Sequence, residues 1–161
     1  MGDLSKPEPV GIGGWLILVV IGLIYSPIQI AYFLMMELWP IFTDGTWSVL
    51  TTSGTEAYHP LWAPLLVFEV IGNLGSIALA LATLWFMFKR SRRTPAVAIA
   101  WLLWTAAFVI ADFIGADMIP AVASQQVDPD TVKQLVRSIV SVCIWVPYFM
   151  VSKRVKATFV Q

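Results

Sequence analysis

The sequence has little charge, one cysteine and one histidine, and each shortage excludes a class of protein. Charged residues make up 12% of the 161 residues, about half of the roughly 25% typical of a soluble domain. The ten basic and ten acidic residues cancel, so no net field draws the chain toward a nucleic acid. Cys143 alone forms no intramolecular disulfide, and His59 alone builds no His-rich zinc or haem site.

Motifs for chemistry are also missing. The chain has no Ser-His-Asp set, no zinc motif and no Walker sequence, and no strand precedes its glycine-rich segment at residues 11–14. We therefore expect no catalytic residue, no metal, no cofactor and no nucleic-acid partner. An enzyme is the less favoured class.

Long apolar runs are what the chain has in abundance. Hydrophobic residues make up 58% of it, with 8 Trp and 9 Phe, and the mean hydropathy is +0.79. About 20 helical residues cross ~30 Å of hydrocarbon, and four stretches are long enough: 11–36, 61–88, 95–121 and 131–151. Because isolated strands cannot satisfy their backbone groups in lipid, we predict an all-α membrane protein. It would be a single domain over 1–161, a four-transmembrane-helix bundle in the lipid bilayer.

The basic residues predict the orientation of the bundle. Eight of the ten lie on one side if the spans alternate; they are Lys6, Lys89, Arg90, Arg92, Arg93, Lys153, Arg154 and Lys156. The two loops on the other side carry Glu37, Asp44, Glu56, Asp128 and Asp130. The positive-inside rule then places both termini in the cytoplasm, N-in and C-in.

The loop over residues 37–60 exceeds the usual limit of about 12–15 residues for a structureless connection. It carries Trp39, Trp47 and Tyr58, the amphipathic rings expected at a membrane interface. Asp44-Gly45 lies between Ile41-Phe42 and Trp47-Ser48-Val49-Leu50 and is compatible with a hairpin turn. The favoured alternative is a coil that rests on the lipid head groups. The Asp128–Thr131 segment is typical of a turn that ends in the N-cap of the fourth span.

Polar side chains inside the spans form the candidate site. A charge at the bilayer centre costs at least ~2.5–3.5 kcal/mol, so such residues need an explanation. Helical rise places Glu69, Asp112 and Arg137 roughly 9–13 Å below the outer helix ends. The whole predicted polar cluster consists of Gln29, Glu69, Asn73, Asp112, Asp117, Arg137 and Ser141. Nearby small residues, among them Gly72 and Gly75, predict a close approach of another helix to the second span.

Three interpretations of this cluster stay open. The favoured one is an ion pair between Arg137 and either Asp112 or Glu69, which would fix the order of the helices. The second is an outward-facing polar pocket in which a surplus carboxylate binds a proton, a cation or a polar head group. The third is that the side chains reach the interface by snorkelling.

Two segments carry a resemblance to a known family. The first segment opens the first span and reads Gly11-Ile12-Gly13-Gly14-Trp15-Leu16. The second segment ends the fourth span with Ile144-Trp145-Val146-Pro147-Tyr148-Phe149 and continues after it with Ser152-Lys153-Arg154-Val155-Lys156-Ala157-Thr158-Phe159. Together they resemble the bacterial domain-of-unknown-function family 2569, the YdgK-like inner-membrane proteins. The resemblance covers nearly the whole chain in layout, but the middle carries no motif of the family. Its signature residues are Gly11, Gly13, Gly14, Trp15, Trp145, Pro147, Tyr148, Lys153, Arg154, Lys156 and Phe159.

The resemblance implies a small multi-pass protein of the bacterial inner membrane. It does not indicate any particular activity. Both signatures would lie at the cytoplasmic face, where Gly13, Gly14 and Trp15 could pack on Trp145 and Tyr148. The alternative for the two aromatic residues of the fourth span is ordinary anchoring at the interface.

The favoured function is that of a non-catalytic accessory or scaffold subunit that binds another membrane component. We expect a homo-oligomer or a membrane-protein partner. The alternative is a small transporter or ligand-binding protein that uses the polar cluster, with Glu69 as the membrane-embedded acid. A membrane enzyme is the third possibility, with Glu69, Asp112 and Asn73 doing acid–base work on a lipid head group.

Overall fold

The computed structural model describes residues 11–160, and every regular element within that range is helical. Four helices are long and apolar enough to cross a membrane: Trp15–Thr43, Trp62–Phe88, Thr94–Asp117 and Pro129–Val151. The all-α fold with four spans is therefore confirmed. The elements are α1 (Trp15–Phe33), η1 (Leu34–Leu38), α2 (Trp39–Thr43), α3 (Thr46–Thr51), α4 (Trp62–Phe88), α5 (Thr94–Asp117), α6 (Pro120–Ala123), α7 (Pro129–Val151) and α8 (Lys153–Thr158).

Helical structure extends into the segment that was expected to be a hairpin or an interfacial coil. The hairpin is wrong, and the chain has no regular element only over residues 52–61, between α3 and α4. The first span continues past Met36 through the π-helical turn η1 into α2. Asp44 and Gly45 turn the chain into α3: Gly45 takes φ 90°, and the Thr46 N–H donates to Asp44 Oδ1 at 2.9 Å. Phe42 stacks on Trp47 with ring centroids 5.1 Å apart, so aromatic packing joins α2 to α3.

The other predicted ends are closer to those in the structure. The third span stops at Asp117 rather than at 121, and Pro120 opens the separate helix α6. The first turn of a helix accommodates proline without the loss of a hydrogen bond. The fourth begins at Pro129, two residues early, with Asp128 as its N-cap.

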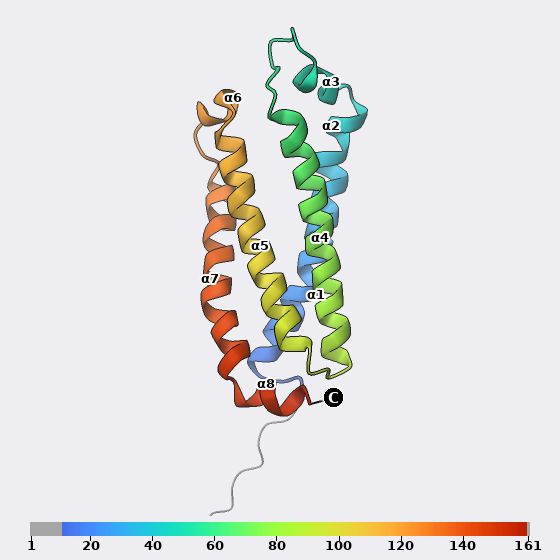
Figure 1. Cartoon of the computed structure of the whole chain (residues 1–161), viewed down its shortest axis with the longest axis vertical. Coiled ribbons are helices and arrows are strands. Elements are labelled where there is room, and N and C mark those ends of the chain that lie inside the picture. The colour runs from blue at the N-terminus through green and yellow to red at the C-terminus, as the bar shows by residue number, and fades with distance from the viewer. Residues whose placement is uncertain (1–10, 161) are drawn as a thin grey trace, which may run out of the picture.

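The long helices pack in chain order, α1 on α4, α4 on α5 and α5 on α7. Figure 1 shows two pairs, α1 with α4 and α5 with α7, which lie closest at the end that carries α8 and spread apart toward α3 and α6. At the α8 end Trp15 of α1 meets Trp145 of α7, with ring centroids 6.3 Å apart.

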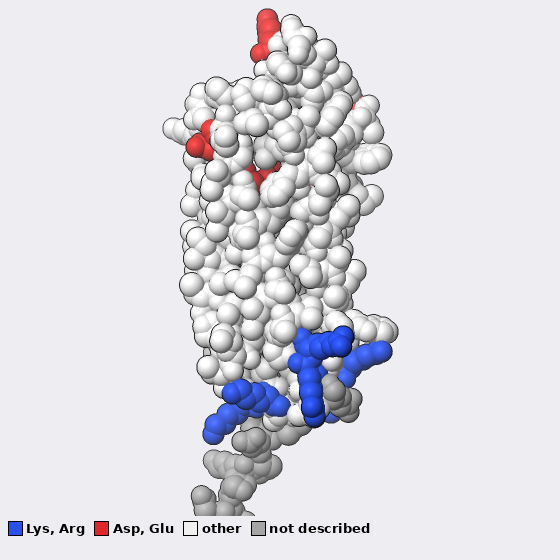
Figure 2. Space-filling model, in the orientation of Figure 1, with Lys and Arg blue, Asp and Glu red and all other residues white. Residues whose placement is uncertain are grey.

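The two ends of the molecule differ in the sign of most of their charged side chains. We call the end with α8 and the α4–α5 turn the basic end, since it carries Lys89, Arg90, Arg92, Arg93, Lys153, Arg154 and Lys156. The opposite, acidic end carries Glu37, Asp44, Glu56, Asp128 and Asp130, and Figure 2 shows this separation on one face. Lys6, which was also assigned to the basic side, lies outside the described residues.

The apolar core is gathered near the basic end. Its buried members come from all four long helices and from α8; they include Leu16, Leu23, Ala80, Met87, Ala98, Phe149 and Val155. Toward the acidic end the buried apolar residues outside this cluster are few, among them Leu38, Leu66 and Ile119. The bundle is thus closed by packing at the basic end and loosely packed at the acidic end.

Candidate functional site

Two carboxylates lie together in the acidic half of the bundle. Glu69 on α4 and Asp112 on α5 are both half-buried, and they are close enough for their charges to interact. By helical rise Glu69 lies about 10 Å below the start of α4, and Asp112 about 7 Å below the end of α5. Figure 2 shows acidic atoms in a recess of the apolar surface in this half. The structure therefore brings together two of the predicted acids.

The pair has few hydrogen-bond partners. Asp112 Oδ1 is buried and has no hydrogen-bond partner within the described part of the chain. Asn73 lies one turn below Glu69, and its Nδ2 donates a hydrogen bond to the Glu69 backbone carbonyl at 2.9 Å. This hydrogen bond is made to the backbone and not to the Glu69 carboxylate. Between residues 11 and 160, no three or more His, Cys, Asp or Glu side chains group closely enough to hold a metal ion.

Small residues on α4 bring α5 close beside this pair. A Cβ on Gly72 would collide with the Phe108 ring, and one on Gly75 would lie 2.9 Å from Trp104. The Trp104 indole Nε1 then donates to Ser76 Oγ at 3.1 Å and to the Gly72 carbonyl at 3.3 Å. The close approach predicted for the second span is confirmed, and the glycines fix the spacing of the helices below the carboxylates.

Arg137 does not join the carboxylates, so the expected ion pair with Asp112 or Glu69 is wrong. Its side chain is exposed, and the one ion pair within residues 11–160 joins Lys133 to Asp130 at 2.6 Å. The buried face of α7 includes the next residue, Ser138, and one residue along a helix turns the side chain by about 100°.

The rest of the predicted cluster is divided. Gln29 and Asp117 are exposed, whereas Ser141 is half-buried on α7. The cluster of seven residues is therefore not a single site in this structure. Glu69, Asn73 and Asp112 form its inner part.

Polar side chains continue along α7 on the outside of the bundle. We define the α7 polar stripe as Gln134, Arg137 and Ser141, which follow one another at helical spacing; the first two are exposed. Four residues beyond Ser141 the same line reaches Trp145, which contacts α1. The stripe therefore follows the exposed part of α7 and ends at the contact with α1 at the basic end.

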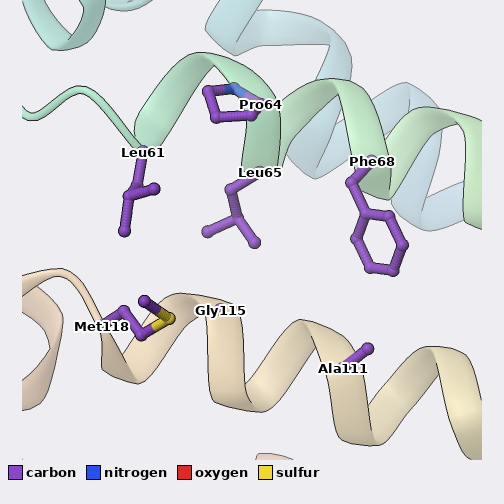
Figure 3. A pocket seen from close by; sticks show the side chains of 7 residues that line it. All are labelled: Leu61, Pro64, Leu65, Phe68, Ala111, Gly115 and Met118. Carbon is purple, nitrogen blue, oxygen red and sulfur yellow. The ribbon is translucent and has the colours of Figure 1, made fainter.

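An apolar pocket of about 270 Å³ opens between α4 and α5 near the acidic end. Figure 3 shows Leu65 and Phe68 of α4 and Leu61 just before it, which face Ala111 and Gly115 of α5 and Met118 just after it. Pro64 completes the lining. Because none of the residues that line it is titratable, the pocket can bind a ligand through apolar contacts but supplies no acid or base.

The residues of the two terminal signatures converge at the basic end. The Gly11 N–H donates to Thr158 Oγ1 at 2.9 Å, and that hydroxyl donates to the Gly11 carbonyl at 3.3 Å. The Arg154 guanidinium lies against Gly13 and Gly14, and a Cβ on Gly13 would collide with it. The signatures therefore join the first helix to the C-terminal helix.

The predicted packing of Trp15 on Trp145 is confirmed, and the glycine part of that prediction is corrected. Trp15 meets Trp145, and Trp145 meets Tyr148 edge-on at 5.7 Å. Gly13 and Gly14 contact Arg154 rather than the aromatic pair. Lys153 and Lys156 are exposed, and Phe159 is buried.

Two structural contacts were not predicted from the sequence. Thr158 is 1% exposed and holds Gly11, but in the sequence it stands within a basic tail that resembles a solvated segment. Trp104 lies in an apolar run of the sequence. The glycines on the facing helix α4 were the one feature of the sequence that could have indicated its hydrogen bonds to that helix.

Comparison with known proteins gives one family and one curated relative. Residues 9–160 match the family model described as "Protein of unknown function (DUF2569)". The chain is similar to the inner membrane protein YdgK of Escherichia coli (strain K12), with 29% identity over 163 residues that cover 98% of this chain and 99% of that protein. No solved structure matches the chain.

Proposed function

The chain belongs to the DUF2569 family, and we propose that it serves the inner membrane as a non-catalytic accessory subunit that binds another membrane protein through α7. The partner would present a helix with an Asp or Glu side chain to Arg137. The four membrane-competent helices and the inner-membrane relative support a multi-pass protein of that membrane.

The observation that carries this proposal is the exposure of Arg137 at membrane depth. By helical rise the residue lies about 12 Å below the start of α7, and its side chain has no acidic partner within residues 11–160. An unpaired charge at such a depth costs free energy, and charged residues in spans usually pair with one another or with backbone carbonyls. Gln134 and Ser141 add hydrogen-bonding groups on the same line, which are the side chains that join helices in membranes.

Site-specific photo-crosslinking in intact membranes tests the proposal. A crosslinker at Gln134 should give a protein adduct of one defined mass, and Arg137→Gln should abolish it. Val136 provides the matched control, because it is 54% exposed and lies about 200° around the same helix from Gln134. Equal adducts at both positions, lipid adducts alone, or a dimer of this chain alone would each contradict an accessory role.

The orientation is a further part of the proposal. The charges at the basic end favour an N-in, C-in topology with both termini cytoplasmic. Reporters after Gln161 and between Lys89 and Thr94 should be cytoplasmic, and a reporter near Gly54 should be external. A cytoplasmic reporter at Gly54 would overturn the topology.

A second candidate function is ligand binding at the carboxylate pair, as in a small cation or proton-coupled carrier. It is favoured by the proximity of Glu69 and Asp112 and by the buried oxygen of Asp112 that has no hydrogen-bond partner within residues 11–160. Closure of the basic end and loose packing of the acidic end would admit a ligand from the acidic side.

Transport assays separate this candidate from the accessory role. Purified protein in proteoliposomes should move protons against a cation such as Na⁺, K⁺ or a quaternary amine. Glu69→Gln should abolish that movement while the protein still inserts and folds. A wild-type protein that moves none of these probes would contradict the carrier function.

A further inference from the structure

We propose that the basic end carries a binding site for the head groups of anionic phospholipids, formed by the α4–α5 turn together with α8. This site lies at the opposite end of the bundle from Arg137 and from the carboxylates. It therefore stands or falls independently of the proposed function.

Helix α8 is held in a fixed position across the basic end (Figure 1). Val155, Thr158 and Phe159 anchor it, with at most 5% of each residue exposed. Ser152 caps the helix by accepting a hydrogen bond from the Val155 N–H at 3.4 Å. Because one face is buried, Lys153 and Lys156 are left exposed at the end of the molecule.

The α4–α5 turn adds more positive charge beside α8. Arg92 Nε donates to the Val160 carbonyl at 2.7 Å, which joins the turn to the segment just after α8. Lys89, Arg90 and Arg93 are exposed in the same turn. Two basic segments that are distant in sequence therefore form one continuous surface, and Figure 2 shows their side chains gathered at this end.

Nothing acidic balances this surface within the described part of the chain. From residue 11 to residue 160, every Asp and Glu belongs to the acidic half or to the acidic end, at positions 37, 44, 56, 69, 112, 117, 128 and 130. The one ion pair of that range lies at the acidic end. No carboxylate of the described residues therefore competes with an external anion for this surface.

The backbone of Arg90 points to a use for its side chain. Arg90 follows the end of α4 with φ 50°, and it is the one residue other than glycine with a positive φ in the described chain. The Ser91 N–H bonds to the Phe86 carbonyl at 3.0 Å, the closure that ends many helices with a glycine at this position. An arginine here accepts a conformational penalty that glycine would avoid.

Aromatic side chains place this surface at the level of the lipid head groups. Trp15, Trp85 and Phe88 are each at least 60% exposed, and Lys89 Nζ lies 4.2 Å from the centroid of the Trp85 ring. Exposed Trp rings mark the membrane interface, where basic residues attract anionic lipids. The anion that fits is a phospholipid phosphate rather than a soluble one.

Lipid binding to the full-length protein in detergent tests this site. Phosphatidylglycerol should bind, by native mass spectrometry and by a rise in melting temperature, and phosphatidylcholine with the same acyl chains should not. Arg90→Gly, Arg93→Gln and Lys156→Gln should each weaken phosphatidylglycerol binding about 5-fold, the effect of one basic residue near an anionic surface. Arg90→Gly removes the charge without disturbing the turn, because the backbone conformation at this position favours glycine.

The controls decide between a lipid site and a general charge effect. Lys133→Gln removes a positive charge at the acidic end and should leave the binding unchanged. Glycerol 3-phosphate should not displace the lipid. Equal binding of both lipids, an equal loss in Lys133→Gln, or displacement by the soluble phosphate would each overturn the proposal.

Discussion

At the basic end the four long helices share one apolar core with α8, whereas toward the acidic end the same helices spread apart and place charged groups between and outside them. Leu16, Met87 and Phe149 meet in the first region. In the second, Glu69 and Asp112 lie together, while Arg137 is exposed. One end of the bundle therefore supplies stability, and the other is where binding chemistry is available.

The difference shows how a small membrane protein can afford unpaired polar groups. Lipid gives helices little hydrophobic drive to associate, so packing and interhelical hydrogen bonds must hold them. Here Thr158 ties Gly11 to α8 and Trp104 ties α5 to α4. With these contacts in place, the acidic half does not need Arg137 as a structural partner.

The largest expected effect comes from the core at the basic end. Met87 is fully buried, so Met87→Ala should leave a cavity and lower the free energy of unfolding by about 2–5 kcal/mol. Ile71→Ala, on the same helix at a residue that is 61% exposed, should change it by no more than about 0.5 kcal/mol. Unfolding in a denaturing detergent measures both, and equal losses would refute the division into two regions.

The next effect tests the tie between the two ends of the chain. Thr158→Val keeps the shape but leaves the Gly11 backbone groups without their hydroxyl partner, at a cost of about 1–3 kcal/mol. Thr158→Ser retains the hydroxyl and should lose much less. Hydrogen exchange at the Gly11 amide should rise in the valine variant alone, and an unchanged rate would show that the tie does not protect this segment.

Features that rest on many residues could be predicted from the sequence, and features that depend on the orientation of one side chain could not. The four spans follow from runs of apolar residues, and the basic end follows from the charges beside them. Arg137 was misplaced because its neighbour Ser138 takes the buried position, and a shift of one residue turns a side chain by about 100°. A spacing pattern among a few polar residues does not fix that angle.

Short elements were missed for a different reason. Helices α2 and α3 have 5 and 6 residues, too few for an apolar period to show. The turn between them follows from Asp44 and Gly45, which equally suited a hairpin. Thr158 could not be identified because its partner Gly11 is 147 positions away in sequence.

A smaller effect, of opposite sign, is expected at the carboxylates. Because the charges of Glu69 and Asp112 interact and neither has an ion-pair partner among the described residues, Glu69→Gln should remove repulsion and raise the free energy of unfolding, on the order of 1 kcal/mol. Asp112→Asn should act likewise, and the double variant should gain less than the sum of the two. A loss of stability in Glu69→Gln would contradict repulsion between the two carboxylates.

The smallest expected effect is a local one at the acidic end, in the turn between α2 and α3. Hydrogen bonds from the side chain and the backbone N–H of Thr46 lower the pKa of Asp44 from its ordinary value of 3.8. A lowered pKa in the folded state means that the ionised form stabilises the turn above the unfolded pKa, and that this contribution is lost as the pH falls through the folded value. The Thr46 amide resonance should therefore titrate below pH 3.8, while the core near Met87 stays unchanged over the same range. Asp44→Asn keeps an oxygen acceptor and removes the titration, so its Thr46 resonance should be flat. A midpoint at or above the ordinary value in the wild type would show that the α2–α3 turn is not held by this contact.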